Sequence, residues 1–388
     1  MLFARSDWFA WTAPVALACG VLTGCGGSST AACGVDQIQL ETGCTSTSQV
    51  ADSVRRVVQD TMQQLDLRAA IVGVSVGDRV VLTQAWGGST PDLPATIDMH
   101  WRIGAVAISY LSTVALQLQD EGKLSLDDPL SKYLPDIRDA SKVTLRMLIA
   151  STSGFPEYVN TIPIEENVYR QWQESELLAD AFSKPSVCDP GTCFAYSHAN
   201  FVLFGQVLAK VTGLPLDTLI SQRILRPLQL NQTFSNDDAF MPLPILNAYS
   251  NELGSYQNST AWNPSWTLAH GAIMSSTIPD ILRSTRAIGG GELISSRARA
   301  EMLAQNPVTS RGKAYGGLGI VVVNGWLLQN PSFFGYSGVS AYLEKNGISI
   351  AVTATKNADS PDVSAASRLF ENIALEIAPS NPVAVTAR

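Results

Sequence analysis

The chain has 388 residues and a formal net charge of -8, with 46% hydrophobic and 15% charged residues. This length exceeds what a single hydrophobic core usually organises, and the composition argues against an intrinsically disordered protein. The negative charge, together with the lack of any Lys/Arg cluster in the sequence, argues against a nucleic-acid-binding protein.

The first 25 residues have the pattern of a bacterial lipoprotein signal. Arg5 precedes an apolar stretch from Trp8 to Leu22 that is short for a transmembrane helix. The sequence Leu22-Thr23-Gly24-Cys25 then matches the lipobox of lipoprotein precursors. We therefore expect lipidation at Cys25 and an exported protein anchored to the bacterial cell membrane, facing the periplasm or the cell exterior. An ordinary cleaved signal or a membrane anchor is the alternative.

Four cysteines follow the lipobox, namely Cys33, Cys44, Cys188 and Cys193. An even number outside the cytosol predicts disulfides, with three possible pairings. The Pro190-Gly191 turn within CDPGTC favours the pair Cys188–Cys193, which leaves Cys33 for Cys44. Zinc is the alternative for closely spaced cysteines, but a single C-x4-C without a second pair nearby argues against a metal site.

The first half of the chain predicts a helix, a hairpin and a second helix. Helical spacing of apolar residues begins at Val50, and alternating strands flank a Gly77-Asp78 turn. A further helix carries Ile108 and Leu111 on its apolar face and is closed by Gly122.

The second half predicts loops and short helices, followed by a return to the sheet. A helix is expected near Pro279–Ile288, strands in GGLGIVVVNG, SGVSAYLEKN and ISIAVTATKN, and a last helix in DVSAASRLFENIALEIA. The predicted fold class is therefore α/β (α+β), an antiparallel sheet flanked by helices with an inserted, mostly helical lobe. The predicted boundaries are a signal at 1–25, a tether at 26–49, one domain at 50–378 (sheet lobe about 50–142 and 263–378, helical lobe about 143–262) and a tail at 379–388.

Five phrases carry a resemblance to a known family: WRIGAVAIS…LQLQDEGKLSLDDPLSKYLP, VTLRMLIASTSGFPEY, PGTCFAYSHANFVLFGQVLAKVTG, NPSWTLAHGAIMSSTIPDI and FFGYSGVSAYLEKNG. In this order they resemble the serine β-lactamase and D-alanyl-D-alanine carboxypeptidase superfamily, in particular its class C and esterase-like branch. The resemblance covers residues 50–378. It implies the family's fold and its active-site cleft, and we expect no cofactor.

The resemblance also locates the family's catalytic motifs, and each one departs from the pattern. The family's S-x-x-K places a serine nucleophile at a helix start and a lysine one turn later. Aligned on RIG, this chain has Ala105 and Ile108 there, so it lacks both the hydroxyl and the amine. The family's Y-x-N becomes Tyr196-Ser197-His198. Its H-x-G or K-x-G, expected on an edge strand, becomes Tyr336-Ser337-Gly338.

A different nucleophile is the remaining route to hydrolysis. Ser310 and Lys313 match S-x-x-K only by chance within a polar loop. A Ser–His pair using His198 is conceivable, although the sequence supplies neither its serine nor an orienting carboxylate. The G-x-S-x-G match at Gly73–Gly77 falls within the predicted hairpin and not on a strand-to-helix turn, so it is no α/β-hydrolase elbow, and the chain has no H-E-x-x-H motif, which argues against a zinc site.

These observations predict a pseudoenzyme on a hydrolase fold. We expect no intact catalytic residues, and a ligand-binding cleft whose floor consists of Ala105, Ile108, Tyr196, His198, Tyr336 and Gly338. The expected partner is a cell-envelope small molecule, a peptidoglycan fragment or a protein, besides the membrane itself. The alternative is a serine hydrolase (an esterase, DD-peptidase or β-lactamase-like enzyme) with a relocated nucleophile, or a purely structural protein.

Overall fold

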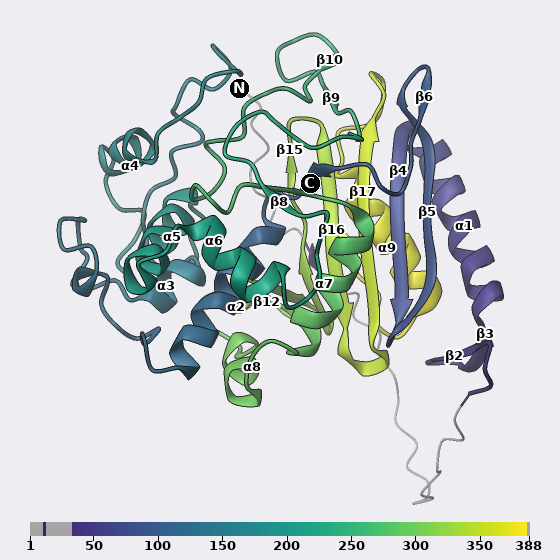
Figure 1. The fold of residues 1–388 in the computed structure, drawn as a ribbon, viewed down its shortest axis with the longest axis horizontal. Helices are drawn as coiled ribbons and strands as arrows, with labels where there is room; N and C mark the ends of the chain where they lie inside the picture. Colours follow the sequence, from purple (N-terminus) through teal and green to yellow (C-terminus); the bar gives the residue numbers. More distant parts are fainter. Residues whose placement is uncertain (1–10, 13–32, 386–388) are drawn as a thin grey trace, which may run out of the picture.

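An antiparallel sheet of nine strands organises the chain, of which the computed structural model describes residues 11–12 and 33–385 (Figure 1). The strand order is β12-β13-β14-β16-β17-β4-β5-β6, and β15 pairs with β16 beside this path. The bounds are β4 Leu67–Val76, β5 Arg79–Thr90, β6 Leu93–Pro94, β12 Ala314–Gly316, β13 Val321–Val323, β14 Trp326–Gln329, β15 Ser332–Phe333, β16 Tyr336–Leu343 and β17 Ile348–Lys356. The predicted hairpin around Gly77-Asp78 is confirmed as β4–β5.

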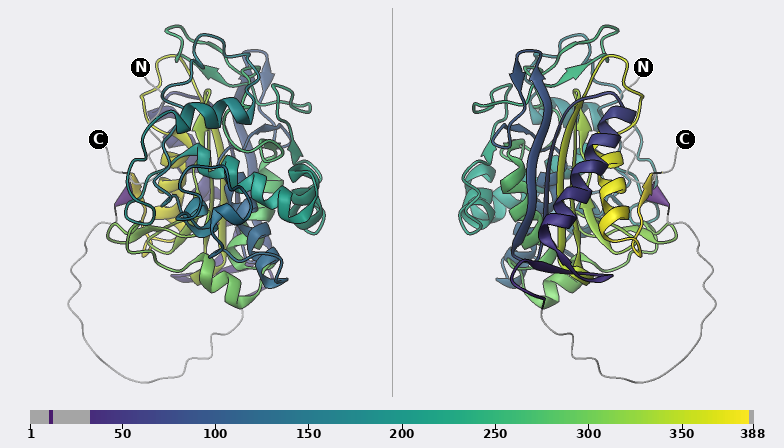
Figure 2. Two further views of the ribbon diagram at one scale, coloured as in Figure 1. Left: turned by 90° about the vertical axis from the view of Figure 1, so that its left-hand side faces the viewer. Right: turned by 90° about the vertical axis from the view of Figure 1, so that its right-hand side faces the viewer.

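Helices cover both faces of this sheet. Helices α1 (Thr47–Gln64) and α9 (Ala365–Ile377) lie together on one face, and α7 (Ile278–Gly290) packs on the other (Figures 1 and 2). Neighbouring residues of β4 separate accordingly, since Ile71 joins the core on the α7 side and Val72 joins the core under α1 and α9. Both central strands are buried on both faces: β4 is apolar almost throughout, and β17 is buried over all but its last residue.

The other helices form a lobe next to the α7 face of the sheet (Figure 1). They are α2 Val106–Asp120, α3 Leu145–Ile149, α4 Glu174–Phe182, α5 His198–Thr212, α6 Leu216–Ile220 and α8 Ser296–Met302. A small sheet in the order β7-β11-β8 adjoins them, with bounds Trp101–Arg102, Met274–Ser276 and Phe234–Ser235. Helix α2 contacts α5 and α6, so it belongs structurally to the helical lobe although its residues fall within the predicted sheet segment.

The N-terminal boundary of the folded domain lies earlier than predicted. Strands β2 (Gln37–Leu40) and β3 (Gly43–Ser46) form a hairpin, and α1 follows directly at Thr47. Ile38 and Leu40 are buried in the core under α1 and α9, which fixes the hairpin to the domain. The prediction of a tether is therefore wrong for residues 37–49.

The predicted tail also takes part in the fold. Val383 is buried in the core under α1 and α9, and Ala384–Val385 (β18) pairs with Trp11–Thr12 (β1) of the predicted signal. Cys25 and the remainder of segment 1–25 lie outside the described residues. Among those that are described, no single helix is long and apolar enough to span a membrane, while α5 and residues 216–225 pass that test only as a bent pair.

Both predicted disulfides are confirmed, Cys33–Cys44 and Cys188–Cys193. The first closes the β2–β3 hairpin against the residues before it. The second lies a few residues before α5, where the backbone N–H of Val187 donates to the carbonyl of Gly154. The second disulfide therefore fixes the segment that leads to Tyr196.

Candidate functional site

Helix α2 begins with a turn that contains no reactive side chain. Ala105 is its N-cap residue and provides no side-chain hydrogen bond to the helix. The backbone N–H groups of Val106, Ala107 and Ile108 donate to carbonyls three residues earlier, at distances of 3.0 to 3.1 Å. The donors at this helix start, where the family places its nucleophile, are thus partly satisfied by the chain itself.

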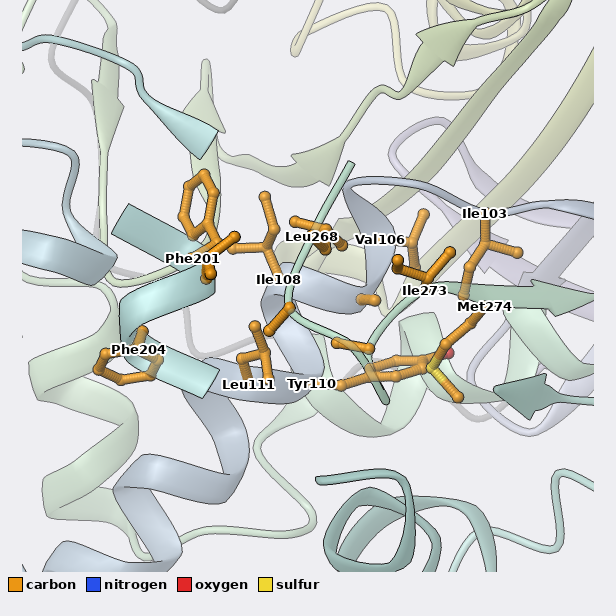
Figure 3. Packing of buried hydrophobic residues seen from close by; sticks show 14 of the residues in the cluster. Ile103, Val106, Ile108, Tyr110, Leu111, Phe201, Phe204, Leu268, Ile273 and Met274 are labelled. Carbon is orange, nitrogen blue, oxygen red and sulfur yellow. The ribbon is translucent and has the colours of Figure 1, made fainter. Parts of the chain in front are cut away.

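Ile108 is part of the hydrophobic core. It is fully buried (0% exposed), and Figure 3 shows it among the apolar side chains of the larger core cluster, including Phe201 and Leu268. Full burial of an Ile side chain contributes about 1.5–3 kcal/mol. A lysine at the same position would place an ammonium group among hydrocarbon atoms, which costs several kcal/mol unless a partner compensates.

The segment Pro331–Phe333 closes over the start of α2. A Cβ atom on Gly104 would lie 2.8 Å from Pro331 and 2.8 Å from Phe333, so this approach requires glycine. Strand β15 pairs with the beginning of β16, with Phe333 opposite Tyr336. The N–H of Gly338 also donates to the Pro331 carbonyl at 2.8 Å. Residues of the chain itself therefore occupy the hydrogen-bonding groups along this part of β16.

The start of β16 is not an open edge: β14 pairs only with Ser340–Leu343, but β15 pairs with Tyr336 and Ser337, and β17 pairs along the other side of the strand. The prediction that Tyr336-Ser337-Gly338 occupies an edge is therefore wrong, and the Pro331–Phe333 segment is what approaches the start of α2. The Tyr336 hydroxyl is buried and donates to the Leu246 carbonyl at 2.7 Å, and burial raises the pKa of this phenol well above its usual range. Gly338 makes room for Trp101, whose ring would lie 2.2 Å from an added Cβ.

Helix α5 begins with a polar network instead. The Ser197 side chain caps the helix by accepting from the Ala199 N–H, and its hydroxyl donates to the Pro156 carbonyl at 2.8 Å. His198 Nδ1 lies 2.7 Å from Glu157 Oε2, which also accepts from the His198 backbone N–H. The side chains of His198 and Glu157 are only 17% and 18% exposed.

Glu157 is held as a carboxylate by its surroundings. Burial opposes ionisation, but the charge and hydrogen bond of His198, with backbone N–H donors, bring the pKa of Glu157 below its ordinary value. The donors to Oε1 are the N–H groups of Tyr158 and Val159. Sequence analysis missed Glu157 as the orienting carboxylate of His198. The only indication of Glu157 in the sequence was its position just after the SGFP phrase. Its contact with His198 could not be predicted, because the two residues are 41 positions apart.

Three serines that could have replaced the nucleophile are engaged elsewhere: Ser109 lies one helical turn beyond Ala105, Ser337 lies in the third motif, and Ser310 begins the chance S-x-x-K match. Ser109 donates to the Val106 carbonyl, Ser337 to the Ala354 carbonyl and Ser310 to the Asn306 carbonyl. Within residues 33–385, no serine hydroxyl hydrogen-bonds to His198. Over the same residues, no group of three or more His, Cys, Asp or Glu side chains could hold a metal ion.

The model of the β-lactamase family matches residues 54–373, which is most of the chain. The chain belongs to the beta-lactamase family. The resemblance inferred from the five phrases is thereby confirmed, and with it the family's fold. Membership does not restore the missing side chains, because a fold can host many activities.

Two curated relatives illustrate the family's range. A beta-lactamase of Pseudomonas fluorescens is 30% identical over 47% of this chain and 51% of its own length, so the match spans about half of that relative. A putative D-alanyl-D-alanine carboxypeptidase of Escherichia coli K12 is 27% identical over 70% of this chain and 72% of its own length.

Solved structures give the same fold. A D-stereospecific amidohydrolase from Streptomyces is 25% identical, with a TM-score of 0.73, over 85% of this chain and 99% of its own. A D-amino acid amidase from Ochrobactrum anthropi is 20% identical, with a TM-score of 0.76, over 86% of this chain and all of its own. The architecture is therefore that of a serine hydrolase of this family.

Proposed function

We propose that this protein is a cell-envelope member of the beta-lactamase family that no longer performs acyl transfer and instead binds a ligand or partner. The binding surface would lie around the starts of α2 and α5. One observation carries the proposal: Ala105 stands at the N-cap of α2 and Ile108 is fully buried one turn later. Alanine has no hydroxyl and isoleucine has no amine, so these side chains cannot act as the nucleophile or as its lysine partner.

The two substitutions are physically consistent with each other. Once the serine is absent, a lysine at position 108 would be a poorly paired cation in the core, and isoleucine removes that cost. A hydrolase that loses its nucleophile loses on the order of 10^6 in catalytic rate, and loss of further catalytic residues then lowers the rate little more. Selection for acyl transfer would not tolerate this pair of residues.

The envelope assignment rests on the lipobox at Cys25 and on the disulfides. Two disulfides in a protein of this size are typical of an oxidising compartment. We infer lipidation of Cys25 and attachment to the bacterial membrane. Replacement of Cys25 by serine should release the protein from the membrane fraction, and retention of the variant there would refute the anchor.

The names of the relatives support a ligand of D-amino acid chemistry. They include a putative D-alanyl-D-alanine carboxypeptidase, a D-stereospecific amidohydrolase and a D-amino acid amidase. A peptidoglycan fragment is therefore our preferred ligand class for this chain.

Covalent capture tests the loss of acyl transfer. Full-length protein is incubated with a fluorescent penicillin and with a fluorophosphonate, and its intact mass is measured. We expect no adduct, and we expect peptidoglycan fragments to raise the melting temperature through binding to the native state. One stoichiometric adduct mapped to a serine would overturn the proposal.

That adduct would establish the second candidate, a hydrolase with a relocated nucleophile. The observation that favours this candidate is the His198–Glu157 pair, which has the orientation that a general base requires. Mapping of the labelled serine would show whether its hydroxyl uses this imidazole.

A further inference from the structure

A surface cavity lies at the β12 end of the nine-stranded sheet, apart from the starts of α2 and α5. Its volume is about 380 Å³, within the range of small-molecule sites. The walls of this β12 cavity come from the segment after α8, from β12 and the residues just before it, from the β13–β14 turn and from the chain after α9. The polar side chains that line it are Gln305, Lys313, Tyr315, Asn324 and Asn381.

Lys313 sets the charge of the β12 cavity. Among the described residues that line it, no other side chain is charged. Within residues 33–385, the Lys313 ammonium has neither a hydrogen-bond partner nor an ion-pair partner. A lysine ammonium carries three donors and no acceptor, so it binds an acceptor and favours an anion. The charge of this cavity therefore favours a ligand with an acidic group.

The asparagine amides of the cavity have fixed orientations. Asn324 Nδ2 donates to the Pro382 carbonyl at 2.9 Å, and Asn381 Nδ2 donates to the Asn324 carbonyl at 2.8 Å. Because a backbone carbonyl only accepts, these contacts identify the nitrogen of each amide. The side-chain oxygen of Asn324 has no partner within the described part of the chain, so it offers an acceptor to a ligand.

Gln305 offers a second acceptor of the same kind. The Ser310 hydroxyl donates its proton to the Asn306 carbonyl at 2.8 Å, so it accepts from Gln305 Nε2 at 3.1 Å and leaves Gln305 Oε1 as the acceptor. Tyr315 is held by its hydroxyl, which donates to the Leu303 carbonyl at 2.9 Å, and its half-buried ring has an apolar face. The cavity thus combines one cationic donor, two neutral acceptors and an aromatic ring.

We propose that the β12 cavity binds a sugar acid. The ligand's carboxylate accepts from the Lys313 ammonium, and its hydroxyls donate to the side-chain oxygens of Gln305 and Asn324. The C–H face of the sugar ring packs on Tyr315. A protonated amine would face the Lys313 charge, and a carboxylate without hydroxyls would leave both amide oxygens unpaired. The inference goes beyond the proposed function, because none of these residues belongs to the site at α2 and α5.

The test compares three monosaccharides that share one ring and differ in charge. D-glucuronate carries a carboxylate, D-glucose is neutral and D-glucosamine carries an ammonium group. Binding to the full-length protein is measured by calorimetry at neutral pH and low ionic strength. We expect glucuronate to bind about tenfold more tightly than glucose, as one charge-assisted hydrogen bond allows, and glucosamine to bind more weakly than glucose.

Variants then assign the contacts. Lys313→Met removes the charge and should weaken glucuronate binding about tenfold while leaving glucose binding unchanged. Gln305→Met removes one acceptor and should weaken the binding of both sugars about threefold. Lys142→Met is the matched control and should leave both affinities unchanged, because Lys142 pairs with Asp139 outside the cavity. Should Lys313→Met fail to fold, Lys313→Gln takes its place.

Two results would overturn the inference. One is glucose or glucosamine binding as tightly as glucuronate, or a failure of glucuronate to bind saturably. The other is a glucuronate affinity that the change at Lys313 leaves unaltered. Neither result touches the loss of acyl transfer, which depends on covalent capture, so the two proposals fail separately.

Discussion

Helices α2 and α5 both begin where the family carries reactive side chains, yet their first turns differ in kind. At α2, Ala105 and the buried Ile108 leave only backbone and hydrocarbon. At α5, Ser197, His198 and Glu157 form a connected set of hydrogen bonds. The first turn of α2 is part of the core, whereas the first turn of α5 carries an oriented imidazole that is 17% exposed. The two helix starts that carry the family's motifs thus differ in chemical equipment in this chain.

The largest expected effect comes from returning a cation to α2. Ile108→Lys should lower the free energy of unfolding by about 3–5 kcal/mol, because the ammonium would be buried without a partner. Denaturant unfolding measures the change, and Ile108→Leu is the control, with a cost below about 1.5 kcal/mol. A loss below about 1 kcal/mol for the lysine variant would show that α2 still provides a polar environment.

Replacing Glu157, which accepts hydrogen bonds at the start of α5, should lower the free energy of unfolding somewhat less than Ile108→Lys does. Glu157→Leu leaves its four donors unpaired and should lower the free energy of unfolding by about 3 kcal/mol. Glu157→Gln, which keeps an acceptor oxygen, should cost less than the leucine variant.

The same carboxylate predicts the sign of a pH dependence. The pKa of Glu157 is lower in the folded protein than its ordinary value of 4.5, so its contribution is present above that value and lost as the pH falls through the folded pKa. Acid unfolding curves should therefore be shallower for Glu157→Leu than for the wild type. Parallel curves for the two proteins would contradict the network at α5.

The disulfide ahead of α5 should contribute about 2 kcal/mol, as expected for a loop closed over five positions. The double variant Cys188→Ser/Cys193→Ser should lose this stability, because the segment leading to Tyr196 becomes looser; denaturant unfolding measures the change. Cys33→Ser/Cys44→Ser is the matched control, since it removes a disulfide distant in sequence from α5. An unchanged free energy of unfolding for Cys188→Ser/Cys193→Ser would show that this disulfide has no part in ordering the segment before α5.

The smallest effect is expected for Ala105→Ser. The hydroxyl returns at the N-cap of α2 without a base, so the free energy of unfolding should change by less than about 1 kcal/mol. Intact mass after incubation with a fluorophosphonate should show no adduct. Labelling of this single variant would mean that α2 retains a proton acceptor despite Ile108.

Local signals in the sequence were sufficient for much of the fold. The Gly77-Asp78 turn between alternating strands predicted β4 and β5, and the turn within CDPGTC predicted a disulfide. Ala105 and Ile108 were identified from the RIG phrase, and their lack of reactive groups needs no coordinates.

Features that depend on distant contacts were not predicted. The β2–β3 hairpin has only four residues per strand and depends on burial of Ile38 and Leu40 beneath α1 and α9. The position of β16 inside the sheet follows from its pairing with β14 and β17, which the phrase FFGYSG does not encode. Glu157 lies far from His198 in sequence, so only the folded chain reveals their pairing.

The β2–β3 hairpin is also the point at which mechanical load would enter the domain. A lipid anchor at Cys25, as proposed, would pull on the chain at Cys33. The disulfide to Cys44 spans eleven positions of the chain and prevents them from being pulled out to about 35–40 Å of extended chain. Glu41 fastens the hairpin tip to the body by accepting from Lys345 at 3.2 Å and from the Ser380 N–H at 3.0 Å. Tension from the membrane would thus reach α1 and the sheet without first unravelling the strand nearest the anchor.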